Sequence, residues 1–279
     1  MRVIAVKSAT PSRSLSVSLH EALRRHWPEY AIEAGGIATF MISAIVFTVL
    51  LEHPASPVHQ ALPHAFLRRA LMGLAMGSTA VSLVYSPWGR QSGAHFNPAF
   101  TLTFFRLGKV EPADALFYAL AQFAGAIAGV SLMAFVLGRL PADPAVRFAV
   151  TLPGMLGETV AFFAEVAISF GLMLLVLASS NSGRTARYTG LFVGLLVATY
   201  ITLEAPISGT SMNPARTLGS ATGAAIFSSL WIYLTAPIVG MLLAAEAYTR
   251  TGRARRVHCA KINHDTQRRC IFRCGYHTT

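Results

Sequence analysis

Charged residues are scarce in this chain of 279 residues, where Asp, Glu, Lys and Arg together make up only 13%. Soluble domains usually carry about 25%, so this chain has too few solvated groups to cover a folded soluble protein of its size. Hydrophobic residues reach 53% and the mean hydropathy is +0.51, which excludes a disordered chain. The composition therefore predicts a protein that crosses a membrane several times.

Cysteine is nearly absent: the chain has three, and all of them lie in the basic C-terminal tail. This excludes a disulfide framework within the apolar body. The tail also holds three histidines, a mixture that hints at zinc, but the spacings match no familiar zinc motif. We therefore expect a solvated, disordered tail near anionic lipid, with no metal site and no cofactor. The residues concerned are His258, Cys259, His264, Cys270, Cys274 and His277.

Acidic residues are also few, 12 against 23 Lys and Arg, which leaves a net charge of +11. In a soluble protein this excess would suggest nucleic acid as a partner. In a membrane protein it more naturally reflects the enrichment of Lys and Arg in cytoplasmic segments, so no nucleic-acid partner is expected. With the N-terminus placed in the cytoplasm, 18 of the 23 basic residues fall on the cytoplasmic side. Both termini are therefore predicted to be cytoplasmic.

Six mostly apolar stretches of 16–24 residues are the candidates to cross a hydrocarbon core about 30 Å thick, which takes about 20 residues. An even number of spans places both termini on one side of the membrane. The stretches are Ala31–Leu51, Ala70–Ser86, Ala115–Gly138, Thr159–Leu177, Tyr188–Leu203 and Leu230–Ala245.

Two connections contain nearly the same string: SGAHFNPAFT at 92–101 and SGTSMNPART at 208–217, identical at six of ten positions. Each copy follows the second span of its half. Each half then has three spans and one such motif, and because three is odd, the two halves must have opposite orientations in the membrane. The pattern predicts an inverted repeat.

Each copy contains Asn-Pro-Ala, which favours the start of a helix: Asn is a preferred N-cap and Pro is favoured at the first helical position. From Asn97 to Gly108 such a helix would span about 18 Å, roughly half a membrane. Two half-helices entering from opposite faces would meet at the midplane, where exposed backbone is tolerated only if it is buried in protein or lines a wet cavity. Asn97 and Asn213 could serve as caps, as donors to a passing solute, or as both. Positive helix ends at the centre would oppose cations, including protons.

These motifs resemble the aquaporin and glycerol-facilitator family, the major intrinsic proteins, over about residues 29–250. The resemblance rests on the two triplets, on Arg216 after the second, on glutamates in the first and fourth spans, and on Ala121-Gln122 with Gly125. It implies an all-α membrane fold of six transmembrane helices and two re-entrant half-helices, in a homotetramer with one pore per subunit. The expected organisation is a cytoplasmic segment 1–28, a channel domain 29–250 with repeats at about 29–138 and 157–250, and the tail 251–279. The triplets are Asn97, Pro98, Ala99 and Asn213, Pro214, Ala215.

In that family, four residues near the outer mouth form a selectivity filter. The resemblance assigns Thr210 and Arg216 from the second loop, and Ile201 from the fifth span, where strict water channels usually have His. The second-span position falls on Met76, with Leu74 as the alternative. Thr217 and Ala221, which replace an Asp and a basic residue of glycerol facilitators, favour the water-channel branch instead.

The resemblance also implies that the four residues before each Asn offer carbonyl oxygens to the pore. Glu33 and Glu165 are expected to accept hydrogen bonds from loop N–H groups, with a proton relay as the alternative. Glu204 either lines the outer vestibule or pairs with loop backbone, and the His95 side chain could add a contact in the pore. The carbonyl positions are Gly93, Ala94, His95, Phe96, Gly209, Thr210, Ser211 and Met212.

The sequence therefore predicts a passive channel for water and small uncharged solutes such as glycerol, urea or ammonia, which excludes protons and ions and lies in the plasma or inner membrane. Its partners would be water, these solutes and the lipid bilayer. A secondary transporter with inverted repeats is the alternative, and it would place acidic groups on the transport path. An enzyme is not expected, because the spans contain no cluster of metal ligands and no nucleophile with a neighbouring base.

Overall fold

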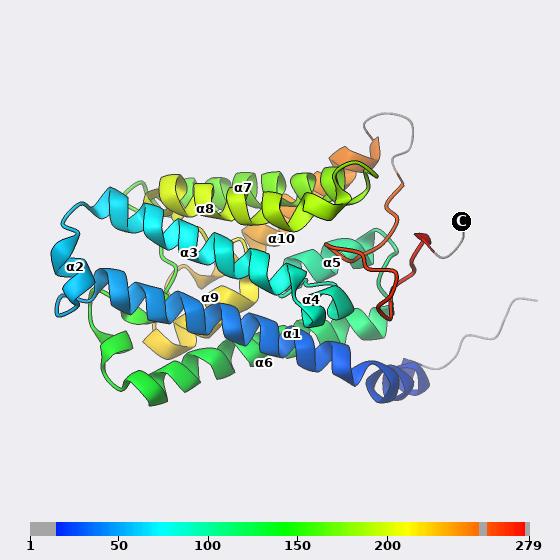
Figure 1. Cartoon of the computed structure of the whole chain (residues 1–279), viewed down its shortest axis with the longest axis horizontal. Helices are drawn as coiled ribbons and strands as arrows, with labels where there is room; N and C mark the ends of the chain where they lie inside the picture. The colour runs from blue at the N-terminus through cyan, green and yellow to red at the C-terminus, as the bar shows by residue number, and fades with distance from the viewer. Residues whose placement is uncertain (1–14, 251–255, 277–279) are drawn as a thin grey trace, which may run out of the picture.

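The structure, a computed structural model, describes residues 15–250 and 256–276, and in these ranges it contains helices and no strand. Long helices lie side by side along the longest axis of the molecule (Figure 1). Five are long and apolar enough to cross a membrane: α1 (Leu15–Glu52), α6 (Pro112–Leu137), α7 (Gly157–Ser180), α8 (Thr189–Ser208) and α10 (Leu230–Arg250).

The sixth predicted span is α3 (Ala65–Tyr85), which has 21 residues and lies along α8. It is less apolar than the other five because Arg68 and Arg69 stand in its first turn. Arg68 pairs with Glu52 at the end of α1, 3.1 Å away. The helix is therefore long enough to span, and one of the two charges at its start, Arg68, is paired with α1.

Short elements join the long helices. Among them, α5 and α9 are the two half-helices that the repeated strings predict, and both begin at the proline of the triplet. The short elements are α2 (Pro57–Ala61), α4 (Pro87–Ser92), α5 (Pro98–Arg106), α9 (Pro214–Ala224) and the 3-10 turns η1 (Leu140–Ala142), η2 (Arg147–Ala149) and η3 (Ala186–Tyr188).

The packing of the helices follows the predicted repeat. In the first half α1 packs on α6, and in the second half α7 packs on α10. Each half-helix also packs across the boundary, α5 against α10 and α9 against α6, while α3 and α8 join the halves side by side. α6 comes close to α1 at Gly125, where an added Cβ would stand 2.2 Å from the carbonyl oxygen of Ala34. The all-α, six-span fold with two half-helices is confirmed.

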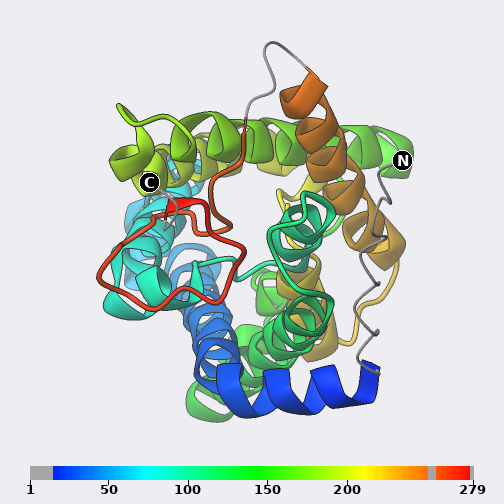
Figure 2. The same ribbon diagram turned by 90° about the vertical axis from the view of Figure 1, so that its right-hand side faces the viewer.

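The helix α1 begins well before the predicted first span at Ala31 and contains Pro28. Proline lacks the backbone N–H and bends a helix at its site. The first part of α1 crosses the end of the bundle, while the rest runs along it (Figure 2). The prediction of a cytoplasmic segment 1–28 falls partly on residues 1–14, which lie outside the described residues.

The tail differs from its prediction, because residues 256–276 fold back over one end of the bundle as an irregular loop (Figures 1 and 2). We call this the tail end; the opposite end carries α2, η1 and η2. Val257, Ile262 and Phe272 are buried there, so the expected solvated, disordered chain is wrong for these residues. The prediction failed because it was based on composition: a few apolar side chains among many charged ones are enough to pack a short loop against the helix bundle. The rest of the tail, including His277, lies outside the described residues.

Candidate functional site

Both half-helices begin as the sequence predicts. Asn97 and Asn213 are the N-caps of α5 and α9, in extended conformation, and each is followed by proline. The side-chain oxygen of Asn97 accepts from the N–H of Ala99 at 2.9 Å, and that of Asn213 accepts from Ala215 at 3.0 Å. Each cap therefore satisfies a backbone donor that the first helical turn leaves without a partner.

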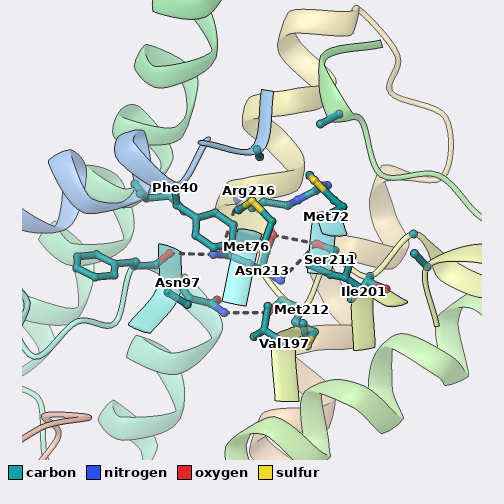
Figure 3. A pocket seen from close by; sticks show the side chains of 18 of the residues that line it. Phe40, Met72, Met76, Asn97, Val197, Ile201, Ser211, Met212, Asn213 and Arg216 are labelled. Carbon is teal, nitrogen blue, oxygen red and sulfur yellow. Dashed lines mark hydrogen bonds between the residues drawn. The ribbon is translucent and has the colours of Figure 1, made fainter. Parts of the chain in front are cut away.

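The amide nitrogens of the two caps tie the loops together. Nδ2 of Asn97 donates to the carbonyl of Met212 at 2.8 Å (Figure 3). Nδ2 of Asn213 donates to the carbonyl of Phe96, also at 2.8 Å. A side-chain amide carries two N–H donors, so each asparagine keeps a second donor after this bond. Capping, cross-linking and donation to a solute therefore use different atoms of one side chain.

The chain before each cap has an unusual backbone. Gly93 and Gly209 have φ of +99° and +84°, and four non-glycine residues that follow them also have positive φ. Such conformations cost of order 1–3 kcal/mol each when the residue is not glycine. The surroundings must supply bonds that offset this cost. The four residues are Ala94 (+58°), Phe96 (+45°), Thr210 (+53°) and Met212 (+52°).

The main support of the first loop is Glu33, a fully buried residue of α1. Its carboxylate accepts from the backbone N–H of His95 at 3.1 Å and of Phe96 at 2.6 Å. The hydroxyl of Ser92 donates to it at 2.7 Å, and so does Nε2 of Gln122 at 2.7 Å. The predicted role as acceptor of loop N–H groups matches this geometry.

Glu165 of α7 supports the second loop in the same way. It accepts from the N–H of Ser211 at 2.6 Å, from that of Met212 at 2.8 Å, and from the hydroxyl of Ser208 at 2.8 Å. Neither Glu165 nor Glu33 lines the cavity described below, so neither lies on the path that a proton relay would use.

A tyrosine completes each support, and the sequence did not reveal it. The hydroxyl of Tyr118 donates to the carbonyl of Ser92 at 2.7 Å, and that of Tyr233 donates to Ser208 at 2.6 Å. Both tyrosines are fully buried. One sequence pattern could have pointed to them: each tyrosine stands seven residues before a glycine, Gly125 or Gly240. At both glycines two long helices come close.

One cavity of about 340 Å³ runs past both asparagines. Towards the opposite end its lining includes Glu52, Arg69 and Arg147; towards the tail end it includes His95 and Ile262. Its walls are mainly apolar side chains of α1, α3 and α8, and one side is formed by the two loops. Of the predicted carbonyl positions, Ala94, His95, Phe96, Gly209, Thr210, Ser211 and Met212 line it.

All four predicted filter positions line this cavity, Met76 and Ile201 with apolar side chains and Thr210 and Arg216 from the second loop. Figure 3 shows Met76, Ile201 and Arg216. Leu74, the alternative to Met76, is 61% exposed and does not line the cavity, whereas Met76 is 2% exposed. Within the described residues, Nη1 of Arg216 is buried without a hydrogen-bond partner. Arg216 forms part of the cavity wall, but this nitrogen itself is not exposed to a solute.

Glu204 does not line the cavity, and the hydroxyl of Thr210 donates to it at 2.5 Å. Ser208, the first residue of the second repeated string, also bonds to this carboxyl through its backbone and its side chain, in line with the alternative of pairing with loop backbone. The carboxylate therefore turns the Thr210 hydroxyl proton away from the cavity. The sequence missed this pair because the two residues are six apart in the chain and are joined by the turn after α8.

Among the apolar wall residues that the sequence missed are Phe40, Met72 and Val197 (Figure 3). Met72 and Val197 stand four residues before Met76 and Ile201 on the same helices, so helical periodicity alone could have found them. Phe40 comes from α1, which carries none of the predicted filter positions, and no pattern in the sequence marks it.

Near the tail end, the tail covers the first loop. The ring of His95 lies between Phe104 and Phe272, and its Nε2 is 2.8 Å from the carbonyl oxygen of Ala260. The carbonyl of Gly93 accepts from the N–H of Ile262 at 3.1 Å, and Gly93 does not line the cavity. The expectation that Gly93 offers its oxygen to the pore is therefore wrong, because the tail takes that oxygen.

Comparison with known proteins agrees with this geometry. The family model of the major intrinsic proteins matches residues 26–248. The chain is 36% identical to "Glycerol uptake facilitator protein-like 6" of Lactiplantibacillus plantarum, over 62% of this chain and 81% of that protein. It is 33% identical to "Aquaporin NIP2-2" of Zea mays, over 84% of this chain and 76% of that protein. With "Aquaporin NIP6-1" of Arabidopsis thaliana it shares 36% identity, but the match spans only 56% of that relative.

A solved structure has the same fold. The aquaglyceroporin from Plasmodium falciparum superposes with a TM-score of 0.66, covering 81% of this chain and 96% of that one, at 22% identity. The chain therefore belongs to the major intrinsic protein family, as a multi-pass membrane protein of the group that forms channels for water and small solutes.

Proposed function

We propose that the chain is a passive channel for water and at least one small uncharged solute, such as glycerol, urea or ammonia. The observation that carries this proposal is that Asn97, Asn213 and the four filter positions all line the same cavity. The relatives support both classes of solute, because they include a glycerol uptake facilitator protein-like chain and aquaporins.

Exclusion of ions and protons follows from the charges around the cavity. The N-terminal ends of α5 and α9 carry partial positive charge and lie where the two asparagines line the wall. Arg216 adds a fixed positive charge beside Met76 and Ile201. A positive centre repels cations and opposes proton transfer along a chain of waters.

The apolar side of the filter supports passage of solutes larger than water. Ile201 offers no hydrogen-bond donor where strict water channels have His, and Met76 is flexible and can adapt to a solute. Apolar walls also suit the carbon skeleton of glycerol better than a ring of polar groups would. Thr217 and Ala221 still favour the water-channel branch, so water is part of the proposal.

Glu33 and Glu165, the buried acids that a transporter would need on its path, instead hold loop backbone. This favours a passive channel over a coupled transporter. Flux should therefore continue without an ion gradient, and it should not saturate at low solute concentration.

Stopped-flow light scattering on reconstituted vesicles tests the proposal, with empty vesicles as the baseline. Wild-type vesicles should pass water and at least one of glycerol, urea and ammonia, with no proton current. Ile201→His should lower solute flux by about tenfold, more than it lowers water flux, because it adds a bulky polar ring to the filter.

Ile201→Val is the matched control, since it keeps the wall apolar, and its solute flux should stay near that of the wild type. Equal losses of water and solute flux in Ile201→His, or a wild type that passes water alone, would contradict the filter assignment.

Both termini are proposed to be cytoplasmic, because 18 of the 23 Lys and Arg then lie on that side. The tail end would accordingly be the cytoplasmic end of the channel. Protease added outside intact cells or right-side-out vesicles should leave a C-terminal epitope tag intact. Removal of that tag from outside would reverse the topology.

A homotetramer with one channel per subunit is proposed from the family alone. Native mass spectrometry in mild detergent should give four chains per particle. A particle of one chain under conditions that preserve channel activity would contradict this assembly.

A further inference from the structure

Four metal-ligating side chains of the tail lie together, outside the candidate pore. The sulfur atoms of Cys259, Cys270 and Cys274 and a ring nitrogen of His264 all lie within 4.8 Å of one another. All three thiols are free, and Cys259 is buried. The residues are separated by four, five and three others along the chain, so the fold brings them together where the sequence spacing gave no zinc motif.

The distances suit a tetrahedral metal ion. A Zn–S bond of about 2.3 Å places two thiolates of one tetrahedral site about 3.8 Å apart. Sγ of Cys259 and Sγ of Cys270 are 3.6 Å apart, and Nε2 of His264 is 3.1 Å from Sγ of Cys274. Three cysteines and one histidine fill all four positions, which is the pattern of structural zinc rather than catalytic zinc.

Lys261, beside these ligands, is an independent sign of negative charge. It is only 1% exposed, and its Nζ donates to the carbonyls of Arg90 at 2.8 Å and Arg269 at 2.6 Å. Among the described residues it forms no ion pair with a carboxylate, although the buried carboxylate of Glu29 also acts on it from a greater distance. A buried ammonium needs a counter-charge. Zn²⁺ with three thiolates and a neutral imidazole carries a net charge of −1, which supplies it.

The ligands bracket the contacts that hold the tail on the first loop. Ala260 and Ile262, which bond to His95 and Gly93, lie between Cys259 and His264 in the chain. Phe272, which stacks on His95 with ring centroids 5.4 Å apart, lies between Cys270 and Cys274. A metal bound to all four ligands would fix the loop in the conformation that makes these contacts.

The tail also bridges the two halves of the channel at this end. The N–H of His258 donates to Oδ1 of Asn181, just after α7, at 2.7 Å. On the other side, the N–H of Arg273 donates to the carbonyl of Lys109, after α5, at 2.9 Å. Between these anchors Ile262 forms part of the cavity wall beside His95.

We propose that Cys259, His264, Cys270 and Cys274 bind one Zn²⁺ ion, which holds residues 257–276 as a plug over the tail end of the channel. Folding and metal binding are coupled in such small sites, because the ligands converge only in the folded loop. Loss of zinc would therefore release the loop from His95 and Gly93. The effect on permeation rests on the proposed channel function, whereas the metal site does not.

Metal content is the first test. Full-length protein, purified in detergent without a histidine tag from cells supplied with zinc, should contain one zinc per chain when the metal content is measured by inductively coupled plasma mass spectrometry. Cys270→Ser with Cys274→Ser should contain none, and His258→Ala should keep its zinc as the matched tail control. Replacement of zinc by Co²⁺ should give the thiolate-to-metal absorption of a tetrahedral site in the wild type only.

Proteolysis of the same samples tests the plug without using flux. With zinc, tryptic cleavage at Arg268, Arg269 and Arg273 should be at least about tenfold slower than after chelation, because the folded loop must open first. The double serine variant should be cleaved quickly in both states. Absence of zinc, zinc retained by the double variant, or a Cys259–Cys270 disulfide in its place would overturn the site.

Permeability gives the last arm. In vesicles, water flux through the double variant should exceed that of the zinc-loaded wild type by at least about twofold, and a permeant chelator should raise the wild type to the same level. Zinc-dependent protection without any change in flux would overturn the plug and leave the metal site. If neither protein passes water while zinc and protection are present, the proposed channel function fails and the zinc site stands.

Discussion

The two repeated loops share their supports and differ in what faces the solute. Each loop rests on a buried glutamate that accepts two backbone N–H groups and a serine hydroxyl, and each is bonded by a buried tyrosine. The asparagine of each loop caps its own half-helix and donates to the other loop. These bonds repeat almost one for one, so they belong to the architecture and not to the choice of solute.

The differences begin three residues after each asparagine, where the first loop has Phe100 and the second has Arg216. Gly209 and Thr210 come shortly before Asn213, the N-cap of the helix that contains Arg216. The hydroxyl of Thr210 bonds to Glu204. The residue of the first loop that matches Thr210 is Ala94. The first loop is covered by the tail instead. The second-loop end of the cavity therefore carries charged and polar groups, whereas the first-loop end is covered by the tail.

Removing one carboxylate tests whether the shared supports are equivalent, and it should have the largest effect. Glu33→Gln and Glu165→Gln each replace an acceptor oxygen by an NH₂ group, so at least one backbone N–H loses its partner, at about 1–3 kcal/mol of stability. Both variants should unfold at lower temperature in detergent and lose most of their water flux. Full flux in one variant and none in the other would show that the supports are not equivalent.

Much of this comparison was predictable from the sequence, because identical strings in opposite halves imply the same local structure. The helix starts at Asn97 and Asn213 and the acceptor role of Glu33 follow from cap chemistry and from buried charge. The Thr210–Glu204 pair and the wall residue Phe40 did not follow, since side-chain orientation and contacts between distant helices leave no periodic signal. The folded tail was missed for a related reason: its ligands meet through loop geometry, which residue spacing does not encode.

Exchanging the residue after the second triplet tests whether the charge difference sets selectivity. Arg216→Val should let cations or protons pass, with a conductance at least about tenfold above that of the wild type, because the fixed charge on the cavity wall is gone. Phe100→Leu, at the matching place in the first loop, should leave cation exclusion intact. Proton flux measured with a pH-sensitive dye inside vesicles, together with water flux, separates these outcomes. Leakage in both variants would mean that the cavity excludes ions by its size and not by Arg216.

The smallest expected effect concerns Gln122, a support that only the first loop has. Its Nε2 donates to Glu33 at 2.7 Å and to Oγ1 of Thr101 at 3.1 Å, whereas α10 offers Glu165 no such amide. Its Oε1 is buried without a hydrogen-bond partner, so Gln122→Met removes two bonds and also one unsatisfied oxygen. These two changes have opposite effects on stability, so we expect the free energy of unfolding to fall by only about 1 kcal/mol.

A double-mutant cycle sharpens this last prediction, because it asks which loop the amide serves. Gln122→Met should be non-additive with Glu33→Gln, which it contacts, and additive within about 0.5 kcal/mol with Glu165→Gln, which it does not. Urea or thermal unfolding in detergent measures each corner of the cycle, and water flux should change little in the single variant. Equal coupling energies with both glutamates would mean that the two loops, joined by the asparagine hydrogen bonds, respond as one unit. The Gln122 amide would then support both loops and not the first loop alone.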